Sequence, residues 1–219
     1  MKEAETTVYF ATRNKGKYEE AAEVANRFGI RLKQLKFSKL EIQSNSLEEI
    51  ASFAARHAAN ATQRPVVAED AGLFINGLQG FPGPYSAYVY ETIGYQGMLR
   101  LMSSTRKRGA HFQAVVAYCR PGNSPICFSG IVNGNISPRA KGKYGFGFDP
   151  IFIPLKRGGQ TFAELSVSEK NRFSHRAKAF AKFFRWFAKK RSEDGLDKLN
   201  NHMPNITNEI RKRKVRING

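Results

Sequence analysis

The stretch VYFATRNKGK, residues 8–17, contains the first decisive change of pattern in the chain. Its first four residues are β-branched, aromatic or small, which predicts a short buried strand. The polar residues that follow indicate a turn. From Tyr18 to Phe28 apolar residues recur near helical spacing, and Gly29 ends the segment. A strand, a loop and a helix are therefore expected in this order.

Outward from this unit, the same reasoning predicts further elements. Ser46 and Glu49 have the spacing of a capping box, which places a helix start at Ser46 and its end near Thr62. Strands are expected at Ile30–Phe37, Pro65–Ala68, Phe112–Tyr118 and Ile126–Ile136. Glycine and proline predict loops at Gly72–Pro84 and Gly142–Pro150, and phenylalanines at three- and four-residue steps predict an amphipathic helix over Ser168–Lys190.

Composition limits the class of protein. The 219 residues suffice for one domain, or at most a two-lobed one, and 41% of them are hydrophobic. No apolar run approaches the roughly 18 residues of a membrane span, and the acidic start of the chain does not resemble a signal peptide. Cys119 and Cys127 have no metal-binding spacing. A reduced, cytoplasmic protein without a membrane partner is expected.

The charge is strongly positive, with 36 Lys and Arg against 18 Asp and Glu and a formal net charge of +18. Such a field attracts polyanions such as nucleotides or nucleic acid, but a solvated basic surface explains it equally well. After Arg191 the composition turns polar and basic. We therefore expect one domain over residues 1–190 and a weakly ordered basic tail over residues 191–219.

Two polar segments near the predicted strand ends could bind phosphate and metal. Thr12, Asn14 and Lys17 lie where a helix N-terminus and a lysine can hold an anion, although a solvated turn has the same pattern. The pair Glu69-Asp70, with Glu41 upstream, offers oxygen ligands suited to Mg²⁺ and a carboxylate that can accept a proton from water. Acidic residues at a turn are the structural alternative.

Two further segments could recognise a base. Gly145–Pro150 places aromatic residues and one acid among glycines, so it could stack on a base and bind its edge, or simply pack as a loop. Glu169–Arg176 brings basic groups to a helix start, where anions are also favoured. A solvated helix face, with His175 as a structural hydrogen-bonding residue, is the alternative. No zinc-binding histidine pattern and no serine-hydrolase motif are found.

Taken in order, these segments resemble the inosine triphosphate pyrophosphatase family, also called Ham1-like, and its archaeal members in particular. The resemblance extends over about residues 8–186 and rests on four matching stretches: FATRNKGKYEE, VVAEDAGLFINGLQGFPGPYSAYVY, SGIVNGNISPRAKGKYGFGFDPIFIP and TFAELSVSEKNRFSHRAKAF.

The resemblance implies an elongated, two-lobed α/β fold, with a central mixed β-sheet flanked by helices and an active-site cleft between the lobes. It implies Mg²⁺-dependent hydrolysis of non-standard purine nucleoside triphosphates (ITP, dITP and XTP) to the monophosphate and pyrophosphate, which cleanses the nucleotide pool. It also implies a homodimer.

Residue roles follow from the same resemblance. Asp70 is expected to be catalytic, by orienting or deprotonating the attacking water, and to bind Mg²⁺ together with Glu41. The phosphates are expected at Thr12, Asn14, Lys15 and Lys17, with a substrate contact at Ala71. Phe146 is expected to stack on the purine, Lys170 to contact the base or sugar, and His175 and Arg176 to bind the 6-oxo group. Asp149 and the backbone of its neighbours Gly147 and Phe148 are expected to bind the edge of the base.

Three positions depart from the family pattern. Ala71 stands where members often have Ser or Thr, and Ala54 stands where many bacterial members have a phosphate-binding Lys. Phe148 replaces a Tyr or Trp. These changes place two substrate contacts in question, but not the reaction class.

Two other functions stay open from the sequence. A basic nucleic-acid-binding protein would explain the charge, although no RNA-recognition, zinc-finger or helix-turn-helix motif is seen. A related pyrophosphatase that acts on another modified nucleotide would explain the motifs.

Overall fold

The computed structural model describes residues 7–37, 42–155 and 158–202. The chain divides into two compact units, Met1–Phe184 and Arg185–Gly219. The first unit contains the β-sheet, all of the helices that cover it and every site residue considered below. In the described part of the chain, no helix combines the length and apolar character that crossing a membrane requires.

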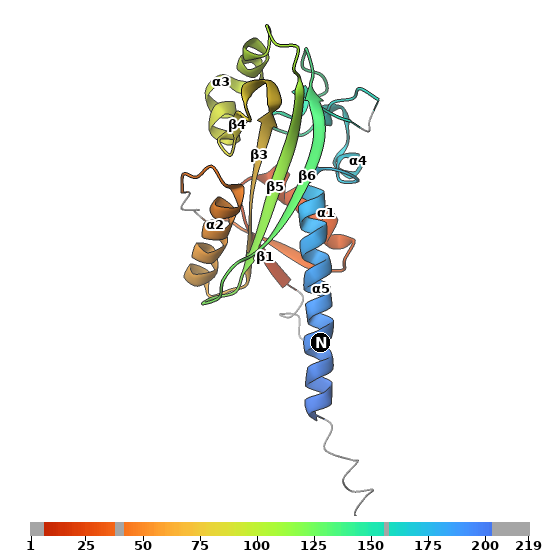
Figure 1. Ribbon diagram of the computed structural model, residues 1–219. Coiled ribbons are helices and arrows are strands. Elements are labelled where there is room, and N and C mark those ends of the chain that lie inside the picture. Colours follow the sequence, from red (N-terminus) through yellow and green to blue (C-terminus); the bar gives the residue numbers. More distant parts are fainter. Residues whose placement is uncertain (1–6, 38–41, 156–157, 203–219) are drawn as a thin grey trace, which may run out of the picture. The chain divides into compact units, whose positions relative to one another are not determined.

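A mixed sheet forms the centre of the first unit, which confirms the predicted α/β fold (Figure 1). The order of its main strands is β2-β1-β3-β5-β6-β7, and β4 pairs with β3. β1 is parallel to β2 and β3, whereas the other pairs are antiparallel. The strands are β1 Thr7–Ala11, β2 Arg31–Leu35, β3 Val66–Ile75, β4 Pro82–Gly83, β5 Gly109–Cys119, β6 Ile126–Ile136 and β7 Phe152–Pro154.

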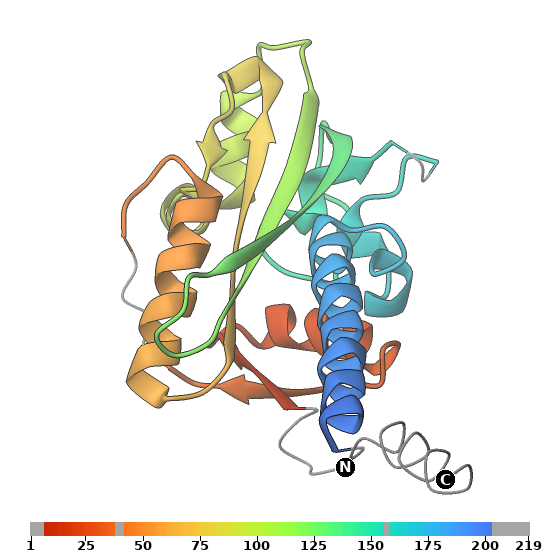
Figure 2. The same cartoon turned by 60° about the horizontal axis from the view of Figure 1, so that its bottom comes forward.

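Helices cover both faces of this sheet. They are α1 Lys15–Asn26, α2 Leu47–Thr62, α3 Ser86–Leu101, α4 Val167–Lys170 and α5 His175–His202. α2 packs on one face against β3 and β5, while α1 and the first turns of α5 lie on the other (Figure 2). Phe180 of α5, for example, contacts the ring of Phe10 in β1 edge-on, with the ring centroids 5.2 Å apart.

The alternation of side chains along β3 assigns them to two different clusters of the core. Val66 and Ala68 belong to a cluster with the alanines of α2, whereas Leu73 and Ile75 belong to a phenylalanine-rich cluster further along the strand. Successive side chains of a strand point to opposite faces. The adjacent acids Glu69 and Asp70 therefore begin on opposite faces of the sheet.

Several predicted boundaries need correction. β6 spans the residues predicted for it, but β3 continues past Ala68 to Ile75, so the loop predicted from Gly72 was wrong over its first residues. Gly72 stays in the strand because the backbone of Gly83 in β4 lies against it, 2.3 Å from the position that a Cβ would take. The helix α3 was not predicted, since glycine and proline dominate the residues before it.

The helix predicted over Ser168–Lys190 is also interrupted. Residues 171–174 form a turn between α4 and α5, and Ser174 accepts a hydrogen bond from the amide of Ala177, at 3.1 Å, in the first turn of α5. At its other end α5 runs to His202, so the first part of the predicted tail is helical. The rest of that tail lies outside the described residues.

The capping box predicted at Ser46 is half formed. The Ser46 hydroxyl accepts from the amide of Glu49, as expected, at 3.3 Å. The Glu49 carboxylate, however, accepts from the hydroxyl of Ser44 at 2.6 Å instead of turning back to the amide of Ser46. That amide donates to the Ser44 hydroxyl, so Ser44 takes over the second half of the cap.

The outer edge of β6 is held by lysines of α5. The ammonium groups of Lys178 and Lys182 each donate to a β6 carbonyl, those of Ile131 and Ser129, at 2.7 Å. The helix can approach this closely because position 130 is glycine. A Cβ on Gly130 would lie only 2.2 Å from the carbonyl oxygen of His175 and 2.6 Å from the amide nitrogen of Ala179.

Replacement of Gly130 by Ala should therefore destabilise the protein. Both neighbouring atoms belong to the backbone of α5, so the helix itself must shift, and overpacking of this kind costs about 1–3 kcal/mol. Urea unfolding of Gly130→Ala measures this loss. The control Asn135→Ala lies at an exposed position of the same strand and should change the free energy of unfolding by less than about 0.5 kcal/mol. Equal effects of the two variants would contradict the close approach.

Candidate active site

The turn after β1 is shaped by its own side chains. Thr12 is buried, and its hydroxyl accepts from the amide of Asn14 at 3.1 Å. The Asn14 side chain in turn accepts from the amide of Lys17 at 2.9 Å and caps α1. Lys15 is exposed beside this cap and lies 3.5 Å from Glu19. The turn thus presents the N-terminus of α1, where Asn14 caps one first-turn amide, next to two lysines.

Lys17 continues from this turn into the interior. Its ammonium lies 2.8 Å from Glu69 of β3, a carboxylate that is fully buried. The second oxygen of Glu69 accepts from Nε of Arg176 at 3.0 Å. Glu69 is therefore engaged by two cations, and it joins the phosphate-side turn to the start of α5.

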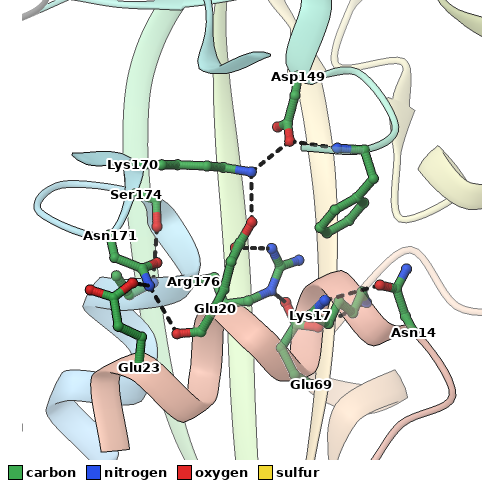
Figure 3. A network of polar contacts seen from close by, with 12 residues as sticks. Asn14, Lys17, Glu20, Glu23, Glu69, Asp149, Lys170, Asn171, Ser174 and Arg176 are labelled. Carbon is green, nitrogen blue, oxygen red and sulfur yellow. Dashed lines mark hydrogen bonds and ion pairs between the residues drawn. The ribbon is translucent and has the colours of Figure 1, made fainter. Parts of the chain in front are cut away.

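Glu20 is the centre of the polar contacts in Figure 3. One of its carboxylate oxygens accepts from Lys170 at 2.8 Å and the other from Arg176 at 2.7 Å. Lys170 also lies 2.6 Å from Asp149. We call Lys17, Glu20, Glu69, Asp149, Lys170 and Arg176 the buried charge network.

The buried charge network balances three cations with three carboxylates that come from five separate parts of the chain. Except for Lys17, whose side chain is 19% exposed, every member is almost completely buried. Buried charges need such pairing, because an uncompensated one costs several kcal/mol. Burial opposes the ionisation of Glu20, but Arg176 and Lys170 outweigh it and hold its pKa below the usual value.

Sequence reasoning missed Glu20, although a signal existed. Glu20 lies one helical turn after Lys17 and next to Ala21, on the face of α1 that is buried. A carboxylate on the apolar face of a helix requires a buried partner. Sequence reasoning also missed Asn171, whose side chain donates to the carbonyl of Glu20 and to the carboxylate of Glu23, both at 3.0 Å.

The glycine-rich loop places its two phenylalanines in different surroundings. The amide of Phe146 donates to Asp149 at 2.9 Å, and its ring centroid lies 5.1 Å from the Lys170 ammonium and 5.3 Å from the Arg176 guanidinium. Phe148 is buried in the core and contacts Tyr90 edge-on. Gly147, between them, has a positive φ of 62° and open space around it. Of these two phenylalanines, Phe146 is the one that lies against the buried charge network.

His175 is a buried aromatic residue of the core at the start of α5. Its ring stacks on Phe112 at 4.6 Å between centroids, and its Nδ1 has no hydrogen-bond partner among the described residues. Burial, together with the nearby cations Arg176 and Lys170, lowers its pKa well below the usual value. The imidazole is therefore neutral at physiological pH.

Of the two residues predicted to bind the metal ion, Asp70 and Glu41, the structure describes only Asp70. Asp70 is half-buried in β3, directly after Glu69 but on the opposite face, so it is not a member of the buried charge network. Ala71 follows it on the face of Glu69. Glu41 lies outside the described residues. Among those described, no group of three or more His, Cys, Asp or Glu side chains is arranged to hold a metal ion.

One of the three positions that depart from the expected pattern, Ala54, lies in α2. It is buried in the cluster under this helix. Arg56, two residues later, is exposed.

Comparison with known proteins gives concordant matches. Residues 8–186 match the model of the Ham1 family. A dITP/XTP pyrophosphatase of Methanopyrus kandleri is 49% identical over 180 residues, which cover 82% of this chain and 95% of the relative. The dITP/XTP pyrophosphatase of Thermococcus kodakarensis is 48% identical, with 81% and 95% covered. Among solved structures, a HAM1 protein from Coxiella burnetii is 30% identical with a TM-score of 0.73, over 84% of this chain and 98% of that one.

The burial of neutral His175 should make stability fall on acidification. In the unfolded chain, His175 binds a proton near pH 6.5. In the folded chain it stays neutral at this pH, because its folded-state pKa is well below that value. Below pH 6.5 this residue should therefore cost up to about 1.4 kcal/mol of stability per pH unit. His175→Phe keeps an aromatic ring and removes the titration, so its stability relative to wild type should rise as the pH falls from about 7.5 to 5.

Urea unfolding at several pH values measures this difference. His111→Phe serves as the matched control, since His111 also stacks on a phenylalanine but is only partly buried and should show a smaller rise. A stability difference between His175→Phe and wild type that stays constant with pH would contradict the assignment.

Proposed function

Because the chain belongs to the Ham1 family, we propose that it hydrolyses non-standard purine nucleoside triphosphates (ITP, dITP and XTP) to the monophosphate and pyrophosphate. The relatives that support this proposal are named dITP/XTP pyrophosphatases. The observation that carries it is the buried charge network, through which the lysine of the anion-binding turn and the aromatic ring of the glycine-rich loop are held in one assembly.

The phosphates bind at the turn after β1. Thr12 and Asn14 form the cap that exposes the first amides of α1, and Lys15 and Lys17 add positive charge beside them. Glu69 holds the ammonium of Lys17 at 2.8 Å, so this cation is fixed before the substrate arrives. A fixed cation needs no reorganisation when charge develops on the departing pyrophosphate.

Asp70 acts on the attacking water, which it orients or deprotonates. Its carboxylate is a hard oxygen ligand of the kind that Mg²⁺ prefers, and Mg²⁺ keeps several of its waters, so a few protein ligands suffice. Asp70 and Glu41 would hold this ion, which when bound neutralises phosphate charge. Asp70 and Glu69 lie in succession on β3. Their side chains point to opposite faces of the sheet, so Asp70 follows the acid that fixes Lys17 in the chain but does not share a face with it.

The base binds at the glycine-rich loop, where the ring of Phe146 provides the stacking surface. Asp149 fixes the loop through the amide of Phe146, and Gly147 and Phe148 place the backbone that reads the base edge. Lys170, His175 and Arg176 supply hydrogen-bond donors. A 6-oxo purine satisfies such donors, whereas the 6-amino group of adenine is itself a donor and leaves them unpaired. The site therefore favours inosine and xanthine over adenine.

The remaining assignments rest on the resemblance. An archaeal source is in keeping with the relatives, which are archaeal and 43–49% identical. A homodimer and a cytoplasmic location are inferred from the family resemblance alone. The nucleic-acid-binding alternative is not favoured by the comparisons. It also leaves unexplained why Glu20, Glu69 and Asp149 are buried as partners of cations.

A coupled phosphate assay with ITP and Mg²⁺ tests the reaction class. Phosphate should appear only after inorganic pyrophosphatase is added, because the first product is pyrophosphate. Direct release of phosphate would mean cleavage at the γ-position and would contradict the proposal. Turnover of dITP and XTP should exceed that of dUTP and of methylated pyrimidine triphosphates; the reverse order would favour a different nucleotide as substrate.

Asp70→Asn tests the catalytic assignment. The amide cannot accept a proton, so kcat should fall by about 10²–10⁴-fold while the melting temperature stays near that of wild type. The control Glu91→Gln changes an exposed carboxylate of α3 and should leave kcat unchanged. Near-normal turnover by Asp70→Asn would remove Asp70 from the mechanism.

A further inference from the structure

Gly16 lies in the first turn of α1, between the two lysines of the anion-binding turn, and the ring of Phe146 rests against it. A Cβ built on Gly16 would lie 2.6 Å from Cδ1 and 2.8 Å from Cε1 of that ring, whereas its next neighbour, Oδ1 of Asn14, would be 3.4 Å away. Gly16 does not have the positive φ that favours glycine. Glycine is therefore required at position 16 because the ring of Phe146 leaves no room for a Cβ.

The ring of Phe146 is held on its other sides as well. The backbone amide of Phe146 donates a hydrogen bond to the carboxylate of Asp149, which anchors the residue. The cations of Lys170 and Arg176 lie 5.1 and 5.3 Å from the centroid of its ring. Glycine at position 145 allows the backbone to lie against the carboxylate of Asp149, since a Cβ there would be only 2.1 Å from Oδ2 of Asp149. The ring position is thus defined jointly by α1, α4, α5 and its own loop.

We propose that Gly16 is a positioning residue for binding of the base, which acts by allowing the Phe146 ring to lie directly on the helix that binds the phosphates. This inference rests on the proposed function, in which Phe146 stacks on the purine. Gly16 has no side chain to offer the substrate. It sets the separation between the stacking surface for the base and the anion-binding turn for the phosphates.

A methyl group at position 16 must displace the ring, because contacts below 3.0 Å do not persist. The atoms in the way belong to a side chain, so the ring gives way and the backbone need not. In addition, alanine is favoured over glycine inside a helix. Gly16→Ala should therefore fold normally and carry a displaced stacking surface beside an intact anion-binding turn.

Steady-state kinetics with ITP test the proposal. Since base stacking on an aromatic side chain is worth about 1–3 kcal/mol, Gly16→Ala should raise the KM for ITP by about tenfold. We expect kcat to change by less than about threefold and the inhibition constant of pyrophosphate by less than about twofold, because the phosphate contacts remain. The control Asn26→Ala, exposed at the end of the same helix, should leave all three values unchanged.

A double-mutant cycle with Phe146→Ala separates action through the ring from a general effect on α1. If Gly16 acts through the ring, Gly16→Ala should raise KM by less than about twofold once the ring is removed. An equal rise in both backgrounds, or a weakened inhibition by pyrophosphate, would overturn the proposal. An active wild type with an unchanged KM in Gly16→Ala would overturn this role of Gly16 alone, whereas a wild type inactive on ITP would overturn the proposed function with it.

Discussion

The carboxylate of Glu20, shared between Lys170 and Arg176, is the interaction on which the site depends. The two cations come from α4 and α5, and the carboxylate between them pairs with both, as buried charges require. Through Lys170 the pairing reaches Asp149 and its loop, and through Arg176 it reaches Glu69 and Lys17 (Figure 3). One residue of α1 thereby connects the segments that bring phosphate-binding and base-binding groups together. The contribution of Glu20 is to hold these segments in one arrangement. A buried ion network of this kind is weak evidence for a gain in folding stability.

Local patterns in the sequence predicted the elements but not their partners. β6 was predicted with its observed bounds, and buried and exposed residues alternate in it from Gly130 to Ile136. The break between α4 and α5 was missed, since it depends on bonds made by Asn171 to a segment about 150 positions earlier. α3 was missed because glycine and proline dominate the residues before it, although its start is anchored there: the hydroxyl of Ser86 accepts from the amide of Leu73 in β3 and donates to the carbonyl of Gly83.

For the site, the residue types were predictable and the geometry was not. Thr12, Asn14, Lys17, Phe146, Asp149, Lys170 and Arg176 were all identified from motifs, and all lie in or beside the buried charge network. No motif indicated that Glu69 pairs with Lys17, since a carboxylate next to another reads first as a metal ligand. The alternation of β3 separates its two acids by face, so that Glu69 lies on the face of Lys17 and Asp70 on the opposite one.

The lysines that bind the carbonyls of β6 also limit how this protein can assemble. An exposed strand edge is a template onto which another chain can add, in orderly dimers and in aggregates alike. Here Lys178 and Lys182 occupy the acceptors of Ile131 and Ser129, and β7 occupies the end of the same edge. A second copy that adds to this strand would first have to displace both lysines. Fibrillar growth of the sheet along this part of β6 therefore carries a cost that an unguarded edge would not impose.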